Sequence, residues 1–130
     1  MLRGDVEKAK ALYAQLSDYG VKTPYDKAGL IEAQKTMMSF GLSSEFAFGK
    51  LKNIGDIAMG DAQKMKSLSL AFAQATSAGK LQGQDLMQMI NAGFNPLQVI
   101  SERTGESMAK LKERMSKGGI SAQELAQAFE

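Results

Sequence analysis

The sequence has neither cysteine nor histidine, and this absence limits the chemistry that the chain can perform. Without cysteine it has no disulfide, no thiolate metal ligand and no mark of an oxidising compartment. Without histidine the commonest general base and the commonest zinc ligand are missing as well. We therefore expect no catalytic residue, no metal site and no cofactor, and the chain is not expected to be an enzyme.

Long apolar runs and a strong charge of one sign are also lacking. No run of about 18 apolar residues occurs, and the N-terminus MLRGDVEKAK has no apolar signal core. Neither a stable membrane insertion nor Sec export is therefore expected. The 16 basic and 14 acidic residues leave a net charge of +2, with lysines scattered among the acids. That distribution is typical of a solvated surface and makes nucleic acid an unlikely partner.

Proline and β-branched residues are scarce, whereas helix-forming residues dominate the composition. Only 2 of the 130 residues are proline, and Ala, Leu, Met, Lys, Gln and Glu are frequent. This composition favours helices. A chain of this length with 44% hydrophobic residues suits one domain that buries roughly two thirds of its unfolded surface. We predict a single all-helical domain over residues 1–130.

Glycines and capping residues divide the chain into short helices. The first helix is expected over residues 5–18, with Gly20 as its stop. Thr23 is expected to cap the second helix, with Pro24 and Asp26 in its first turn. Further stops are expected at Gly41, Gly60, Gly79, Gly93, Gly105 and Gly118-Gly119, and further caps at Ser43 or Ser44, Asp61, Asn95, Ser107 and Ser121. The predicted fold is an all-α compact bundle of about seven or eight short helices in a helical-hairpin arrangement, joined by Gly-rich turns.

Apolar residues recur at helical spacing and define the expected core. In chain order these residues are Val6, Ala9, Tyr13, Leu16, Leu30, Ala33, Met37, Phe40, Ala47, Leu51, Ile54, Ala58, Met65, Leu68, Phe72, Ala75, Leu86, Met89, Ile90, Leu97, Ile100, Met108, Leu111, Met115, Leu125 and Phe129.

A weak internal repeat relates two segments of the chain. GKLQGQDLMQMI from Gly79 and GGISAQELAQAF from Gly118 share glycine, glutamine and leucine at matched positions. Their offset has the size of a helical-hairpin repeat, although chance similarity between capped amphipathic helices explains it equally well. A boundary at Gly79 would divide the domain into sub-units 1–78 and 79–130. Because the chain stops at Glu130 within the last predicted helix, we expect it to be a segment of a longer protein.

The charged residues offer no persuasive site. GKLQG at Gly79 lacks the Ser/Thr and the preceding strand that a phosphate-binding loop requires. The carboxylates expected in first helical turns or at caps are Asp5, Asp26, Asp61, Asp85 and Glu124, and nothing pairs two of them for acid–base catalysis. Lys50 and Lys52, like Lys110 and Lys112, fall on different faces of a helix and are expected to be solvated.

The nine methionines are the remaining candidates for a binding role. Met37, Met65, Met89, Met108 and Met115 share the faces of the expected core, so core packing explains them. Met38, Met59 and Met87 lie off those faces, and we predict that they contact a partner protein.

The order of several segments resembles the conserved N-terminal region of bacteriophage or prophage tail tape measure proteins. The matching segments are TPYD, LIEAQKTMMSFGLSSEFAFGKLKNIGDIAMG, QATSAGKLQGQDLMQMINAGFNPL and MSKGGISAQELAQAFE. The middle segment carries Gly79, Lys80, Leu81, Gln82, Gly83, Leu86 and Ala92-Gly93 in a fixed helix-loop-helix frame.

The resemblance implies a virion structural protein that takes part in tail assembly and sets tail length. Its partners would be tail tube, tail tip or assembly chaperone proteins, together with self-association. It would act in the virion tail and, during assembly, in the bacterial host cytoplasm. Members of the family are also thought to assist DNA passage. Some carry peptidoglycan-cleaving domains, whose catalytic residues have no counterpart in this segment.

Two other functions stay open at this stage. The short helix pair around Gly93 to Pro96 and the slight basic excess would suit a nucleic-acid-binding helical domain. A hydrolase is the third hypothesis, because some relatives carry such domains. Salt-dependent retention on DNA and turnover of peptidoglycan would separate these functions from a structural role.

Overall fold

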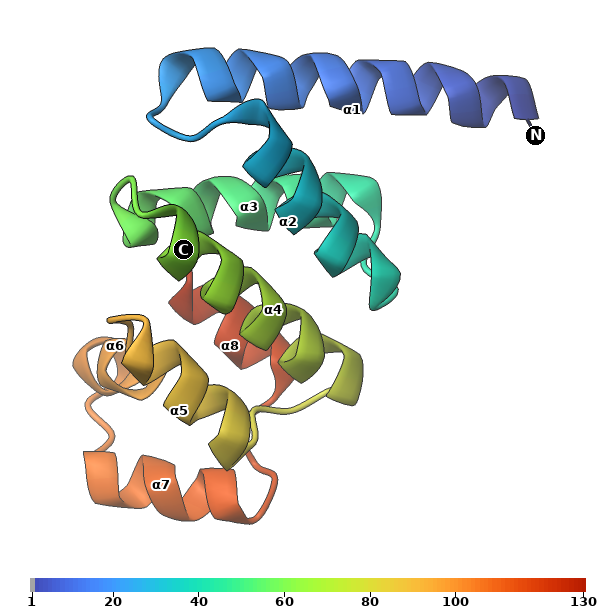
Figure 1. Cartoon of the computed structure of the whole chain (residues 1–130). Coiled ribbons are helices and arrows are strands. Elements are labelled where there is room, and N and C mark those ends of the chain that lie inside the picture. Colours follow the sequence, from blue (N-terminus) through green and yellow to red (C-terminus); the bar gives the residue numbers. More distant parts are fainter. Residues whose placement is uncertain (1) are drawn as a thin grey trace.

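The computed structural model describes residues 2–130, with side chains described from Val6 onward. Within that range the chain forms eight α-helices (Figure 1). They are α1 (Leu2–Lys22), α2 (Lys27–Ser39), α3 (Ser44–Ala58), α4 (Ala62–Ala78), α5 (Gly83–Asn91), α6 (Pro96–Thr104), α7 (Met108–Ser116) and α8 (Ala122–Ala128). The prediction of an all-α bundle of short helices is confirmed.

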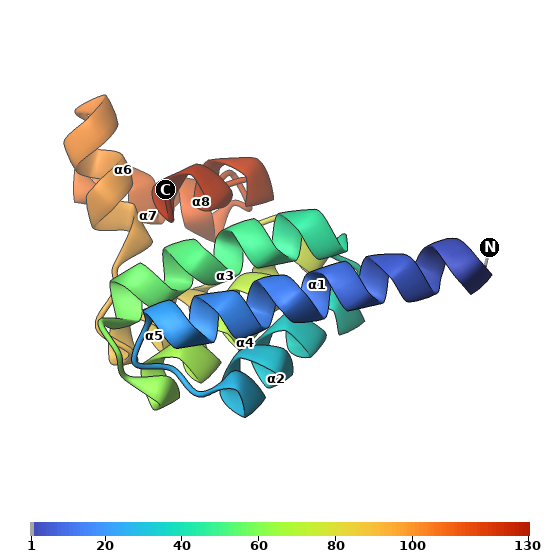
Figure 2. The ribbon, with the colours of Figure 1, turned by 90° about the horizontal axis from the view of Figure 1, so that it is seen from above.

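Helix α4 is the central element of the bundle. It packs against α2, α3, α5 and α8, and its Phe72, Leu68 and Ala71 are fully buried. The buried hydrophobic residues form one continuous cluster that reaches from Leu16 in α1 to Phe129 after α8. Helix α1 lies along the outside, and its N-terminal half extends past the other helices (Figures 1 and 2).

Most helix ends follow the predicted capping residues. The confirmed N-caps are Ser43, Asp61, Asn95, Ser107 and Ser121, and each side chain accepts a backbone N–H of the first turn. At the other end of α4, Gly79 has φ +83 and its N–H donates to Thr76 O. A left-handed residue here turns the chain sharply, which favours glycine.

The predicted boundary between the first two helices is wrong. Gly20 lies inside α1, which continues to Lys22. A Cβ on Gly20 would lie 3.3 Å from Leu30 Cδ1, so this glycine allows α1 and α2 to approach closely. Thr23 does not cap α2, because that helix begins only at Lys27; the Thr23 hydroxyl donates to Tyr19 O in α1 and accepts from Tyr25 N. Asp26 is the cap instead, and its carboxylate accepts from Gly29 N at 3.0 Å.

Several residues of the expected core lie outside it. In α1 only Leu16 of the predicted face is buried, whereas Val6, Ala9 and Tyr13 are exposed because the helix projects beyond its neighbours. Ile90 is also partly exposed. Phe40, Met108 and Met115 are partly buried and pack against the core cluster.

The two segments of the internal repeat meet at their loops. Leu81 N donates to Ile120 O at 2.9 Å, and Ala122 N donates to Gly79 O at 3.0 Å, which forms a short antiparallel bridge. Leu81 and Ile120, which occupy matched positions in the repeat, are both fully buried. The α4–α5 and α7–α8 segments are therefore joined loop to loop.

Lys50 was predicted to be solvated, but it is only 5% exposed. Its ammonium donates to Ala126 O at 3.0 Å and to the carboxylate of Glu130. The reason is a tertiary contact, because the Ala126 carbonyl near the end of α8 faces the lysine in α3. Helical spacing alone would have placed Lys50 on the buried face of α3, since it lies three residues after the buried Ala47 and four before the buried Ile54.

Candidate protein-contact site

Three of the carboxylates singled out in the sequence, Asp26, Asp61 and Glu124, take part in helix caps or ion pairs. Asp26 and Asp61 cap α2 and α4. Glu124 binds the guanidinium of Arg114, with nitrogen–oxygen distances of 2.7 and 2.8 Å. The side chain of Asp5 lies outside the described residues. Among the described residues no group of three or more metal-ligating side chains occurs.

Among the described side chains, Asp85 is the one buried carboxylate, and it lies in the first turn of α5. Burial raises its pKa, and a hydrogen bond from the backbone N–H of Gln82 partly opposes the rise. Since the folded chain binds this proton more tightly than the unfolded chain, the ionised form at neutral pH reduces stability.

Replacing Asp85 with asparagine should therefore raise the thermal unfolding midpoint at pH 7. The amide can still accept from Gln82 N but carries no charge to bury. The advantage should disappear as the pH falls toward 3.8, the ordinary pKa of the aspartyl group, because the native carboxyl then becomes neutral too. Circular dichroism melts at pH 7 and at pH 3.5 measure the difference. Asp18→Asn, which removes an exposed carboxylate paired with Lys22, is the control and should lower the midpoint only slightly. Equal midpoints for Asp85→Asn and the native chain at pH 7 would refute this account.

The structure places the three candidate contact methionines on the surface but not together. Met59 is 89% exposed, Met87 56% and Met38 39%. Met38 lies in the last turn of α2, Met59 in the turn between α3 and α4, and Met87 in α5. Met87 borders a shallow hollow between α4 and α5 with Gln84 and Lys64. Contact with a partner stays a prediction for all three.

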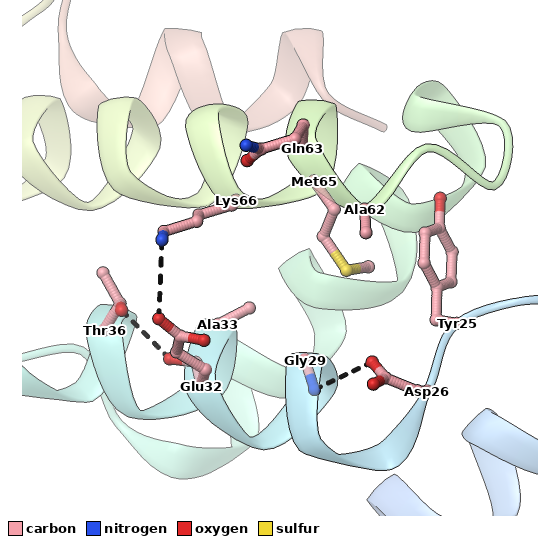
Figure 3. Close-up of a pocket in the computed structure, with 10 residues that line it drawn as sticks. All are labelled: Tyr25, Asp26, Gly29, Glu32, Ala33, Thr36, Ala62, Gln63, Met65 and Lys66. Carbon is pink, nitrogen blue, oxygen red and sulfur yellow. Dashed lines mark hydrogen bonds and ion pairs between the residues drawn. The ribbon is translucent and has the colours of Figure 1, made fainter.

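A groove between α2 and α4 is the second surface feature (Figure 3). It has a volume of about 160 Å³. Its buried lining residues are Tyr25, Ala33 and Met65, and its exposed ones include Ala62 and the ion pair of Glu32 with Lys66, 3.7 Å apart. Apolar at the base and polar at the rim, this α2–α4 groove suits an inserted apolar side chain. The spacing of residues within one helix does not indicate this groove, because two separate helices form it.

The turn that carries Met59 is fixed by Tyr25. The Tyr25 hydroxyl donates to Gly55 O at 2.6 Å and accepts from Gly60 N at 2.9 Å. Burial raises the pKa of Tyr25, so the hydroxyl stays protonated and able to donate. Met59 has φ +52 and ψ +42, and it is the only non-glycine residue described with positive φ. An exposed side chain is thus held in a conformation that L-residues rarely adopt.

The sequence profile of the tape measure protein family matches residues 1–130, the whole chain. The chain belongs to the tape measure protein family. This tape measure chain is accordingly a structural component of the phage tail. No curated protein matches it, and no solved structure does. None of the described helices of the tape measure chain has the length and apolarity needed to cross a membrane.

Proposed function

We propose that the tape measure chain is a non-enzymatic module that contributes to tail assembly and tail length determination through protein–protein contacts. The match of the family profile to the whole chain carries this proposal. Tail tube, tail tip or assembly chaperone proteins are its proposed partners, in the virion tail and in the host cytoplasm during assembly. The exposed Met38, Met59 and Met87 are the proposed contact residues, and no cofactor or enzymatic activity is included.

The size of the chain bears on how the module acts. Even as one continuous helix, its residues would span only roughly 200 Å at 1.5 Å per residue. The folded bundle is much shorter because turns reverse the chain after each helix. We therefore assign it a docking role, as a single folded domain within a longer polypeptide whose extended part does the measuring.

Lys50 and Lys52, which were considered for phosphate contacts, give no support to a nucleic-acid-binding role. Lys50 is buried against α8, and the Lys52 ammonium lies 5.0 Å from the centre of the Phe48 ring. This pair does not form a stripe for phosphate contacts.

The proposed function can be tested by deleting the codons for residues 1–130 from the tape measure gene of the phage. We expect loss of most complete tails in electron micrographs of lysates, because partners would lack their docking site. Replacing the exposed Lys112 with alanine is the control and should leave tails intact. Tails of normal number and length after the deletion would contradict the proposal. Salt-dependent binding of the purified chain to DNA would favour the alternative.

A further inference from the structure

We propose that residues 107–118, which contain α7, open from the bundle as one unit, and that Arg114 is the latch that keeps this unit closed. We name residues 107–118 the α7 flap. Its opening is a property of the folded chain alone, so it does not depend on the proposed function. Three features carry the inference: a peripheral helix, fixed residues on either side of it, and one arginine that joins it to both.

Helix α7 is peripheral in the bundle. It lies at the edge that faces away from α1, and α6 is its main helical neighbour (Figure 1). Leu111 is the one fully buried side chain of α7, whereas Met108 and Met115 are only partly buried. Few buried apolar contacts therefore hold the helix in place, which is typical of segments that open locally.

The residues on either side of the α7 flap are fixed by contacts outside it. Before the flap, the Ser101 hydroxyl of α6 donates to Glu106 O at 2.7 Å. After the flap, Ile120 is fully buried, and its O accepts from Leu81 N. Gly118, at the end of the flap, has φ +74, and glycine tolerates large changes of backbone conformation. The flap can thus move while its neighbours in the chain stay in place.

Arg114 joins the α7 flap to both of these fixed parts. Its Nη1 lies 2.9 Å from Oε1 of Glu106, which precedes the flap. Its Nη2 lies 2.7 Å from Oε1 of Glu124, in the first turn of α8. Nη1 also donates to Glu124 Oε2 at 3.1 Å, so the pairing with Glu124 is bidentate. The three side chains are between 22% and 30% exposed, so water screens this network less than it screens an ordinary surface pair.

The two glutamates require the guanidinium in the closed state. Both of them bind Nη1 of Arg114, so their carboxylates approach the same position from different segments. Without the arginine, two negative charges would face each other in a partly buried place. Opening of the flap would return both carboxylates to water and relieve the repulsion. The closed state therefore depends on Arg114 more than on the apolar contacts of α7.

Hydrogen exchange of the purified chain, followed by mass spectrometry, tests the opening. A helix of nine residues is marginal on its own in water, so its amides should exchange once it leaves the bundle. In the native chain we expect the α7 amides to exchange at least about tenfold faster than those of α4. Low urea concentrations should leave the α7 rate nearly unchanged, because local opening exposes little surface. Exchange of α7 and α4 at one common rate would overturn the proposal.

Two substitutions separate local opening from global unfolding. Arg114→Met should raise the exchange rate of the α7 amides by at least about tenfold, because it removes the latch. Phe46→Ala is the matched control, because Phe46 stacks on Phe72 in the core and lies outside the flap. It should speed the exchange of α4 and leave that of α7 unchanged. An α7 rate that follows Phe46→Ala, or that ignores Arg114→Met, would refute the latch.

A charge-neutral variant tests why the latch works. In Arg114→Met combined with Glu106→Gln and Glu124→Gln, no carboxylates face each other, so the α7 exchange rate should return most of the way to the native value. Dilute hydrogen peroxide gives a second readout, because oxidation of methionine follows exposure. Met108 and Met115 should be oxidised faster in Arg114→Met than in the native chain, while the exposed Met59 reacts equally in both. A triple variant that exchanges as fast as Arg114→Met would contradict the role of charge in the latch.

Discussion

Replacing Phe72 with alanine should lower the free energy of unfolding by about 3–5 kcal/mol, the largest loss expected from a single truncation in this chain. Phe72 is fully buried in α4. Its ring centre lies 4.9 Å from that of Phe129 after α8 and 6.1 Å from that of Phe46 in α3. Truncation would leave a cavity where three helices meet, and helices fixed by so many other contacts cannot close it fully.

Urea unfolding followed by circular dichroism measures this loss. Phe46→Ala is the matched control, because Phe46 stacks on Phe72 but is 38% exposed. Its removal should decrease stability by about 1 kcal/mol, since it leaves a surface notch rather than a cavity. Equal effects of the two substitutions would show that Phe72 is not the centre of the core.

Replacing Lys50 with glutamate is expected to have the second largest effect, a loss of about 3–5 kcal/mol. The ammonium of Lys50 lies against the Ala126 carbonyl at the end of α8 and against the carboxylate of Glu130. A glutamate would place a negative charge in this buried position, beside another carboxylate and the negative end of a helix. The Ala126 carbonyl would also lose its hydrogen-bond donor.

Thermal unfolding of Lys50→Glu and Lys50→Met distinguishes charge from packing. Methionine keeps most of the volume and leaves Glu130 in contact with water, so its effect should be clearly smaller. A loss for Lys50→Met as large as that for Lys50→Glu would mean that packing, not charge, explains the site.

The pH dependence gives a second check on Lys50. A hydrogen bond and the positive charge of Lys50 lower the pKa of Glu130. A lowered carboxyl pKa contributes stability above its ordinary value of 4.5, and that stability is lost as the pH falls through the folded value. The native chain should therefore lose more stability than Lys50→Met on acidification from about pH 5 to about pH 3. Parallel losses would contradict the ion pair.

The sequence predicted the helix ends best where the determining contact is local. Ser43, Asp61 and Ser121 cap their helices through backbone groups two or three residues away, so the pattern contains all the information needed. Gly20 was wrongly predicted to end the first helix, because its actual role depends on the close approach of Leu30 in another helix. Val6 and Tyr13 show a further limit, since helical spacing identifies an apolar face but not whether another element covers it.

The candidate site was only partly predictable. Helical spacing correctly separated Met87 from the core-facing methionines, because it reports direction around a helix, whereas Met59 lies in the turn after α3. It could not reveal that Met59 has a left-handed backbone or that Tyr25 fixes its turn from 35 residues away. The α2–α4 groove depends on small residues of two helices coming together, and no spacing within one segment encodes that.

The antiparallel bridge between Lys80 and Ser121 has a consequence for how the chain can vary. It ties the residues after α4 to those before α8, so α5, α6 and α7 form an excursion of the chain that starts and ends at the same point, with α5 packed on α4. An insertion in the connection between α6 and α7 would enlarge this excursion without moving α4 relative to α8. Relatives could therefore acquire new surface there while Phe72 and Phe129 keep their contact.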